Sequence, residues 1–469
     1  MTRERHSLGA TGTDQRRGSV WGVFFIWLAA TMTASTIPLG GIMAQMFPGA
    51  PFLPVILAAS GFFLLVGIIS IPGFVYGLPT MVVSEHLFGA RVNRLISAAN
   101  WLSQVGWESV VLVIVIYIVR SLLFPGDTVY PLSATLTALV VSLFANFTVP
   151  LLGYRAIVVS QKAGAIVLMV FSVVIFLHIP ARNSLILGHT VMSGTTLRDA
   201  LGALSLGLMG GALSWTMFSS DYSRFMRPGT SLARVAMAPA IGGFLGNFVI
   251  LLVSVALYQA GGVAFGKDGI AFPRGMFHSE FLYYGFCIFA VIGLLASNFL
   301  NAFSSAFSLA VMLRRDLNRR LSTFVDASIG TAIAVWILFY APTFLDVFEV
   351  FLSLIIIVAA PWTGVVAVEI LADRIGGGLP ADPASWLAGR RRRTVVMAVA
   401  VAASALFSSN PLWTGYGAQA LGGVDISPLV GLILAALLTG AARLVRGAGA
   451  QDGLDPANAG AQALQGPSR

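Results

Sequence analysis

Apolar runs long enough to cross a lipid bilayer recur along this chain from Val20 to the region of Arg443. A hydrocarbon core of roughly 30 Å needs about 20 apolar residues per helix. The chain is 57% hydrophobic and 10% charged, whereas about 25% of the residues in a soluble domain are charged. Alternation with a period of two residues, which marks β-barrels, is absent. The sequence therefore predicts an all-α polytopic membrane protein.

The apolar runs predict twelve transmembrane helices. The expected spans are roughly 20–46, 52–77, 95–123, 131–150, 154–179, 200–222, 233–261, 281–312, 323–341, 346–371, 394–408 and 427–444. With a cytoplasmic N-terminus, these spans place 23 of the 28 basic residues inside, as the positive-inside rule requires. We therefore expect a multi-pass protein of the cell (inner or plasma) membrane with both termini in the cytoplasm.

The polar segments between and beyond the spans divide the chain into five regions. We expect an N-terminal tail (1–19), a transporter core (20–372), a cytoplasmic linker (373–393), two further helices (394–446) and a disordered tail (447–469). No region outside the membrane can hold a soluble catalytic domain or a basic module for nucleic acid. Any activity must therefore reside in the helix bundle.

Few side chains offer catalytic chemistry. The single cysteine, Cys287, excludes an internal disulfide and a cysteine-based metal site. Glu108 and Asp221 are the plausible acid/base candidates for an intramembrane enzyme, and they lie on different expected helices. Arg224 follows Asp221 at a spacing that predicts a structural ion pair. We expect no enzyme, no metal site and no organic cofactor.

Polar residues inside hydrocarbon are costly, so they mark helix contacts or a pathway. The first such island, T-M-T-A-S-T-I-P-L-G-G (31–41), contains Thr33 and Ser35 and ends in proline and glycine. Its oxygens could serve a cation or a substrate, or they could bond to the backbone of a kinked helix.

In the second island Gln104, Trp107, Glu108 and Val111 share one helical face, because their spacing is i, i+3, i+4 and i+7. An indole, an amide and a carboxylate would suit a flat heterocycle that forms hydrogen bonds at its edge. The alternative for Glu108 is a structural carboxylate paired across the bundle.

In the third island Gly207, Gly210 and Gly211 loosen the sixth helix before Ser214 and Trp215. These glycines could also serve close helix packing.

In the fourth island Ser297, Asn298 and Asn301 make the eighth helix polar at mid-span. The first and sixth helices stand five helices apart, which is the arrangement of transporters with inverted repeats and broken helices at the substrate site. The repeats would cover about 20–180 and 200–372.

At four motifs the chain resembles the nucleobase–cation symporter-1 family, on its bacterial cytosine permease side. They are G-L-P-T-M-V-V-S-E-H-L-F-G (77–89), N-W-L-S-Q-V-G-W (100–107), S-S-D-Y-S-R-F (219–225) and A-S-N-F-L-N-A-F-S-S-A (296–306). The resemblance implies a leucine-transporter-type fold, with a 5+5 inverted repeat and two peripheral helices. It also implies uptake of a nucleobase by alternating access with Na⁺ or H⁺.

The resemblance also implies roles for individual residues. Trp107 would stack on the ring and Gln104 would bond its edge. The sixth helix would form one wall of the site with Gly211, Ala212 and Ser214. The eighth helix would contribute the side chain of Asn298. The coupling cation would lie near Gly293, Ala296 and Ser297.

Three positions depart from the family pattern. Val111 stands where many members have asparagine, and Ala212 stands where some have a stacking aromatic residue, a role that Trp215 could take. Ala296 precedes Ser297 where two hydroxyl residues are common. A missing oxygen weakens the case for Na⁺ and raises Glu108 as a proton carrier.

We therefore expect a secondary symporter that acts as a monomer, and its expected partners are a small heterocyclic substrate, a coupling cation and the lipid bilayer. The expected substrate-binding residues are Thr33, Ser35, Gln104, Trp107, Glu108, Gly211, Ala212, Ser214, Trp215, Asn298 and Asn301; Gly293, Ala296, Ser297 and Glu108 are expected for the cation. The alternatives are a transporter of the same fold for another small polar solute and a membrane sensor that binds ligand without net flux.

Overall fold

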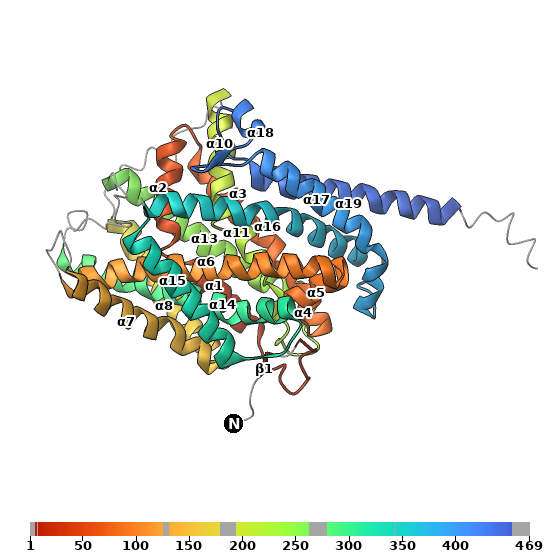
Figure 1. The fold of residues 1–469 in the computed structure, drawn as a ribbon, viewed down its shortest axis with the longest axis horizontal. Coiled ribbons are helices and arrows are strands. Elements are labelled where there is room, and N and C mark those ends of the chain that lie inside the picture. The colour runs from red at the N-terminus through yellow and green to blue at the C-terminus, as the bar shows by residue number, and fades with distance from the viewer. Residues whose placement is uncertain are drawn as a thin grey trace, which may run out of the picture.

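The computed structural model of the chain describes residues 5–6, 8–124, 131–178, 194–261, 279–341 and 343–452. The described residues form a bundle of long helices with two small strand pairs at its margins (Figure 1). In chain order the elements are β1 (Arg5–His6), α1 (Val20–Thr31), α2 (Thr36–Met46), α3 (Phe52–Gly61), α4 (Phe63–Tyr76), α5 (Thr80–Phe88), α6 (Ala90–Leu123), α7 (Leu132–Leu152), α8 (Tyr154–His178), α10 (Gly194–Met209), α11 (Ala212–Thr216), α12 (Ser220–Ser223), α13 (Leu232–Gly261), α14 (Glu280–Leu313), β2 (Leu317–Asn318), α15 (Arg319–Phe339), α16 (Phe344–Ile375), a 3₁₀ helix η2 (Pro383–Gly389), α17 (Arg390–Leu406), β3 (Ser409–Asn410), β4 (Trp413–Thr414), α18 (Tyr416–Ala420) and α19 (Ser427–Asp452).

The described helices confirm a polytopic membrane protein. Ten are long and apolar enough to cross a bilayer, and α1 with α2 forms an eleventh span that is bent by 54°. The predicted span 394–408 corresponds to α17, which has 17 residues and begins with four arginines. The helix α19 continues to Asp452, so it includes the first six residues of the predicted tail 447–469, whose remainder lies outside the described residues.

The spans differ in how much of their surface faces the protein. In α6 and α14, 78% of the residues in the most apolar stretch of 18 are buried inside the protein. In α7, α15 and α19 the corresponding share is 33%. A helix that is apolar all round and buried all round belongs in the centre of a bundle. The helices α6 and α14 therefore lie in the interior of the bundle, whereas α7, α15 and α19 lie on its lipid-facing side.

A buried carboxylate joins the last helices to the core. Glu369 of α16 is fully buried and accepts hydrogen bonds from Arg392 and Arg393 of α17, with nitrogen–oxygen distances of 2.9 and 3.2 Å. Arg443 of α19 also bonds to Glu369 and, at 2.6 Å, to Asp373. Three guanidinium groups thus compensate the buried charge of one carboxylate and fix α16, α17 and α19 together.

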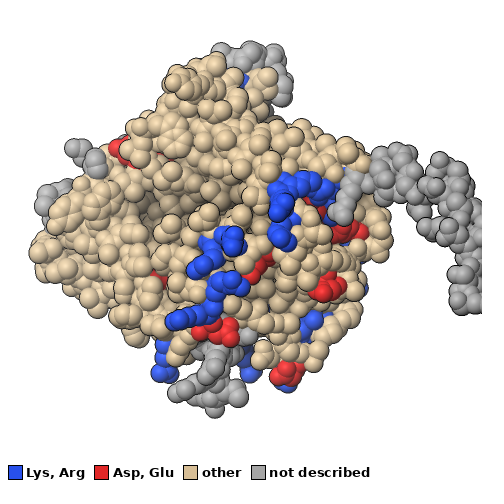
Figure 2. Space-filling view, turned by 45° about the vertical axis from the view of Figure 1, so that its right-hand side comes forward, with Lys and Arg blue, Asp and Glu red and all other residues tan. Residues whose placement is uncertain are grey.

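The N-terminal segment closes one end of the bundle. Strand β1 pairs with β2 after α14, and Gly18 exchanges backbone hydrogen bonds with Phe225 and Arg227 at 2.7 and 3.0 Å. On the face drawn in Figure 2, Lys and Arg gather in a band from just right of the centre to the lower edge, and the upper and left parts show few of them. This one-sided distribution is what the positive-inside rule predicts for a membrane protein.

Candidate functional site

The first span is broken in its middle. The helix α1 ends at Thr31 and α2 begins at Thr36, so the segment from Met32 to Ser35 has no helical backbone. The hydroxyl of Thr31 donates to the carbonyl of Trp27 at 2.8 Å, an interaction that favours a bend. Loosened backbone at this depth is tolerated where it lines a cavity.

The sixth span is broken where the glycines predicted it. The helix α10 ends at Met209, and α11 begins at Ala212. A Cβ on Gly210 would lie 2.7 Å from the side chain of Leu39, and one on Gly211 would lie 2.4 Å from the carbonyl oxygen of Gly207. Only glycine fits between these neighbours, so the break in α10–α11 can pack closely against α2.

The two breaks meet α6 and α14 around one small cavity. Its lining residues are Thr33, Ser35, Trp107, Gly210, Ser214, Trp215, Phe218, Ser297 and Asn301. The cavity has a volume of about 10 Å³, which is about the space that one water molecule needs. A ring-shaped ligand therefore needs some side-chain movement to enter, and it would be enclosed once bound.

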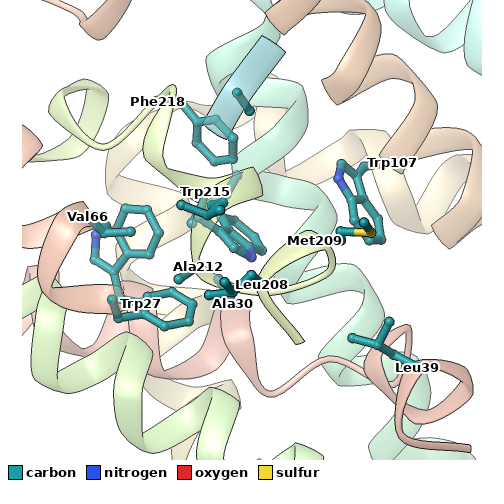
Figure 3. Close-up of a cluster of buried hydrophobic side chains, with 14 of the residues drawn as sticks. Trp27, Ala30, Leu39, Val66, Trp107, Leu208, Met209, Ala212, Trp215 and Phe218 are labelled. Atoms are coloured by element: carbon teal, nitrogen blue, oxygen red, sulfur yellow. The ribbon is translucent and has the colours of Figure 1, made fainter. Parts of the chain in front are cut away.

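Two tryptophans supply the aromatic surface of this cavity. Trp107 packs edge-on against Phe348 and Phe351 of α16, with ring centroids 5.8 and 5.4 Å apart. Trp215 packs edge-on against Trp27 at 5.7 Å. Figure 3 shows Trp107 and Trp215 on separate elements, with Met209 beside Trp107 and Ala212 between Trp215 and Trp27. Edge contacts behind each indole leave ring faces that can stack on a flat ligand.

The polar part of the lining comes from both breaks and from α14. The hydroxyls of Thr33 and Ser35 lie 3.1 Å apart, and the hydroxyl of Ser214 donates to the carbonyl of Gly211 at 2.8 Å. Within the described part of the chain, the side chain of Asn301 has no hydrogen-bond partner. Its amide can therefore both donate to and accept from a ligand.

Several predicted substrate residues lie outside the lining. Gln104 donates to the hydroxyl of Ser308 at 3.2 Å, between α6 and α14. Asn298 donates to Asn146 of α7 at 2.9 Å. Gly211 and Ala212 form the backbone of the break itself. In this conformation these four residues support the cavity, whereas Phe218 and Gly210 line it without having been predicted as ligands.

Glu108 also lies outside the lining. A Cβ on Gly330 of α15 would be 3.8 Å from the Cβ of Glu108, so the side chain leaves α6 on the side of α15. The three residues Gln104, Trp107 and Glu108 therefore do not share one environment as expected. Gln104 contacts α14, Trp107 lines the cavity and Glu108 lies beside α15. Trp107 alone among the three reaches the cavity.

The predicted cation position brings the first break against α14. A Cβ on Gly293 would lie 2.5 Å from the carbonyl oxygen of Met32, so the two backbones approach closely. Ser297 lines the cavity nearby, but the carbonyl of Ala296 already accepts a hydrogen bond from Gln161 at 2.6 Å. Within the described ranges, no three His, Cys, Asp or Glu residues gather as they would for a transition metal.

Among the described residues, the predicted ion pair between Asp221 and Arg224 does not form a direct contact, although the two charges still interact. Asp221 instead bonds to Thr80. The guanidinium of Arg224 lies over the rings of Phe225 and Phe307, at 5.0 and 4.8 Å from their centroids. The i, i+3 spacing was misleading because α12 is only one turn long, with a partner on another helix.

Comparison with known proteins places the chain among transporters. The family model described as permease for cytosine/purines, uracil, thiamine, allantoin matches residues 11–431. The purine-cytosine permease fcyB of Emericella nidulans is 22% identical over 344 residues, which cover 69% of this chain and 64% of that protein. The purine-cytosine permease FCY21 of Saccharomyces cerevisiae is 23% identical over 53% of this chain and 47% of its own length. The chain thus aligns with less than two thirds of these curated relatives.

Solved structures show the same fold. The nucleobase-cation-symport-1 family transporter Mhp1, closed with bromovinylhydantoin bound, has a TM-score of 0.69 at 18% identity, and the match covers 93% of this chain and 94% of that one. A Na⁺-coupled sialic acid symporter in a substrate-bound, outward-open state has a TM-score of 0.58 at 15% identity, with 91% and 90% covered. At these identities the likeness establishes the leucine-transporter-type architecture alone.

Proposed function

Because the chain belongs to the family of permeases for cytosine/purines, uracil, thiamine and allantoin, we propose that it imports a nucleobase or related heterocycle by cation symport. One observation carries the proposal: two broken helices, together with α6 and α14, place two tryptophans, four hydroxyl groups and an amide around one buried cavity. Binding sites of this kind combine an apolar enclosure with a few convergent polar groups.

The substrate would lie between the indoles of Trp107 and Trp215. Any flat ring can stack on an indole, so the two tryptophans favour flat heterocycles as a class but do not select one of them. Discrimination would come from the ring edge, which meets the hydroxyls of Ser214 and Ser35 and the amide of Asn301. A site built to form hydrogen bonds rejects rings that lack the matching donors and acceptors.

The transport cycle would use the two breaks as its moving parts. Broken helices of transporters bind at the midplane, and one part of the bundle rocks against the other around the site. The coupling cation, Na⁺ or H⁺, would bind between the carbonyl of Met32 and Ser297, or at Glu108. We further propose that the protein acts as a monomer in the cell membrane with both termini in the cytoplasm.

Ligand-dependent thermal stability of the purified protein tests the substrate class. A ligand that binds only the folded state stabilises it by about 2.7 kcal/mol at 100 times its Kd. We expect cytosine, a purine, uracil, allantoin or thiamine to raise the melting temperature, with sorbitol and leucine as non-aromatic controls. If none of these heterocycles raises the melting temperature, the proposed substrate class is wrong.

Uptake into proteoliposomes then tests transport. The ring that stabilises the protein should accumulate under an imposed Na⁺ or proton gradient and equilibrate without one. Binding without any gradient-driven uptake would instead identify a membrane sensor.

A further inference from the structure

Glu108 is a buried carboxyl group without a donor. Its residue is 1% exposed, in the middle of α6. Among the described residues, neither carboxyl oxygen has a hydrogen-bond partner. Burying an ionised carboxylate without a partner costs several kcal/mol, so such a group needs a counter-ion or a proton.

A second carboxyl group, that of Asp326, lies on α15, the helix that packs against α6 at Glu108. Asp326 of α15 is fully buried, and Gly330, one turn further along α15, packs against α6 at Glu108, where a Cβ on the glycine would lie 3.8 Å from the Cβ of Glu108. Asp326 accepts a hydrogen bond from the indole nitrogen of Trp101 at 2.8 Å and another from the hydroxyl of Ser305 at 2.7 Å. Both donors stabilise the ionised form of Asp326.

The two acids therefore have opposite surroundings. Two neighbouring carboxylates in a medium of low dielectric constant repel each other, so the pair favours a state with one proton. Charge repulsion from Asp326 disfavours an ionised Glu108, and among the described residues hydrogen-bond donors reach Asp326 but not Glu108. The shared proton belongs on Glu108.

No basic group compensates the pair. Within the described residues, no Arg, Lys or His forms an ion pair or a hydrogen bond with Glu108 or Asp326. On α6 and on the helices packed against it, the remaining titratable residues lie toward the helix ends: Arg91, Arg94, Tyr117 and Arg120 of α6, Glu85 and His86 of α5, Glu280, Tyr283, Tyr284 and Cys287 of α14, Arg320 of α15, and Asp346, Glu349, Glu369, Asp373 and Arg374 of α16. The helix α7 carries none.

We propose that Glu108, with Asp326 as its partner, is a proton-binding site behind the substrate cavity and that it carries the coupling proton. The second half of this inference rests on the proposed symport function. The first half, proton occupancy of Glu108, stands on the burial and the hydrogen bonds of the pair.

The pair is connected to the cavity along two helices. Trp107, the residue before Glu108, lines the cavity, so a displacement of this part of α6 on ligand binding also displaces Glu108. On α14, Asn301 lines the cavity one turn before Ser305, the donor to Asp326. Substrate binding can therefore alter the packing and hydration of both acids.

In the cycle, the O–H bond of Glu108 breaks when water reaches it in the inward-open state. The proton passes to water and leaves the carboxylate. Return to the outward-open state allows the carboxylate to take a proton from the other side. Release of substrate and release of the proton are thus linked through α6 and α14.

Infrared spectroscopy of the purified protein tests proton occupancy without any substrate. We expect the carboxylic C=O band of wild-type protein at neutral pH to lose intensity in Glu108→Gln, which keeps the shape of the protonated acid. The control Glu349→Gln, which removes a half-buried carboxyl of α16, should retain the band. Equal band intensity in wild type and Glu108→Gln would overturn the site.

Transport of radiolabelled cytosine in proteoliposomes tests coupling. Glu108→Gln should lose at least tenfold of the accumulation driven by a proton gradient, whereas the control Glu349→Gln should accumulate cytosine as wild type does. Asp326→Asn should change the pH dependence of that accumulation. Accumulation by Glu108→Gln at the wild-type level would overturn the coupling role. A wild type that transports no ring would instead contradict the proposed function, and the infrared result would still decide the proton site.

Discussion

Asp221 of α12 holds the first residue of α5, because one carboxylate oxygen accepts hydrogen bonds from the backbone N–H and the hydroxyl of Thr80, at 2.7 and 3.0 Å. Both residues are buried. The N–H groups in the first turn of a helix have no partner within the helix, and a carboxylate there satisfies one of them and complements the helix dipole. This contact ties the broken sixth span to the segment that follows the second.

Removal of this acceptor should destabilise the folded protein. Asp221→Ala leaves a buried N–H and a buried hydroxyl without their acceptor, which costs about 1–3 kcal/mol in unfolding free energy. Asp221→Asn keeps one acceptor oxygen and should lose less. Chemical denaturation in detergent measures both, with the exposed Asp14→Ala as the control. Asp221→Ala and Asp14→Ala with equal midpoints would contradict a structural role for the contact.

Trp107 should contribute more to ligand affinity than to folding. Stacking of a base on an aromatic side chain is worth about 1–3 kcal/mol, so Trp107→Ala should weaken binding by about 10- to 100-fold. Isothermal titration with the stabilising ring gives the dissociation constant. The control is Trp336→Ala, which removes an indole that is 49% exposed on α15. If both variants bind as wild type does, Trp107 does not stack on the ligand.

Gly293 should be intolerant of any side chain. A Cβ there would lie 2.5 Å from the carbonyl oxygen of Met32, so Gly293→Ala must push the first break away from α14. Overpacking of this kind costs about 1–3 kcal/mol, and it should also reduce cation-driven uptake. Gly164→Ala of α8 is the matched control, because its Cβ would meet only Ile292, at 3.8 Å. Equal uptake by the two variants would show that the close approach at Gly293 does not matter for coupling.

The spans other than 394–408 and the positions of both breaks could be predicted from the sequence. Long apolar runs have few solutions in a bilayer, and glycines beside hydroxyls at Gly210 and Thr33 mark where a helix loses its hydrogen bonds. The direction in which each polar side chain points from its helix could not be predicted in this way. Asn298 and Asn301 lie one turn apart, yet one bonds to α7 and the other lines the cavity.

The reason is the burial of the central helices on all sides. Periodicity assigns a face only when one side of a helix meets lipid or water, and α6 and α14 meet protein around most of their circumference. Glu108 of α6 lies against Gly330 of α15, and this is a contact between residues far apart in the chain. Sequence alone carries no signal for that pairing.

Outside the membrane spans, Asp425 should give the protein a pH-dependent stability. It lies between α18 and α19 and accepts hydrogen bonds from the backbone N–H groups of Ser409 and Ser427, both at 2.8 Å. Burial raises the pKa of Asp425, and hydrogen bonds from Ser427, Ser409 and Ser408 only partly offset this effect. The folded state therefore binds the proton more tightly than the unfolded chain, whose aspartate pKa is about 3.9.

The sign of the effect follows from this difference in proton affinity. The stabilising contribution is complete below the unfolded pKa and is lost as the pH rises through the folded pKa. We expect the melting temperature of wild type to fall, relative to Asp425→Asn, as the pH rises from the unfolded pKa of about 3.9 through the raised folded pKa, since asparagine cannot titrate. Scanning fluorimetry across this range measures the difference, and at higher pH the two curves should run parallel. A difference that stays constant from acid to neutral pH would show that folding does not shift the pKa of Asp425.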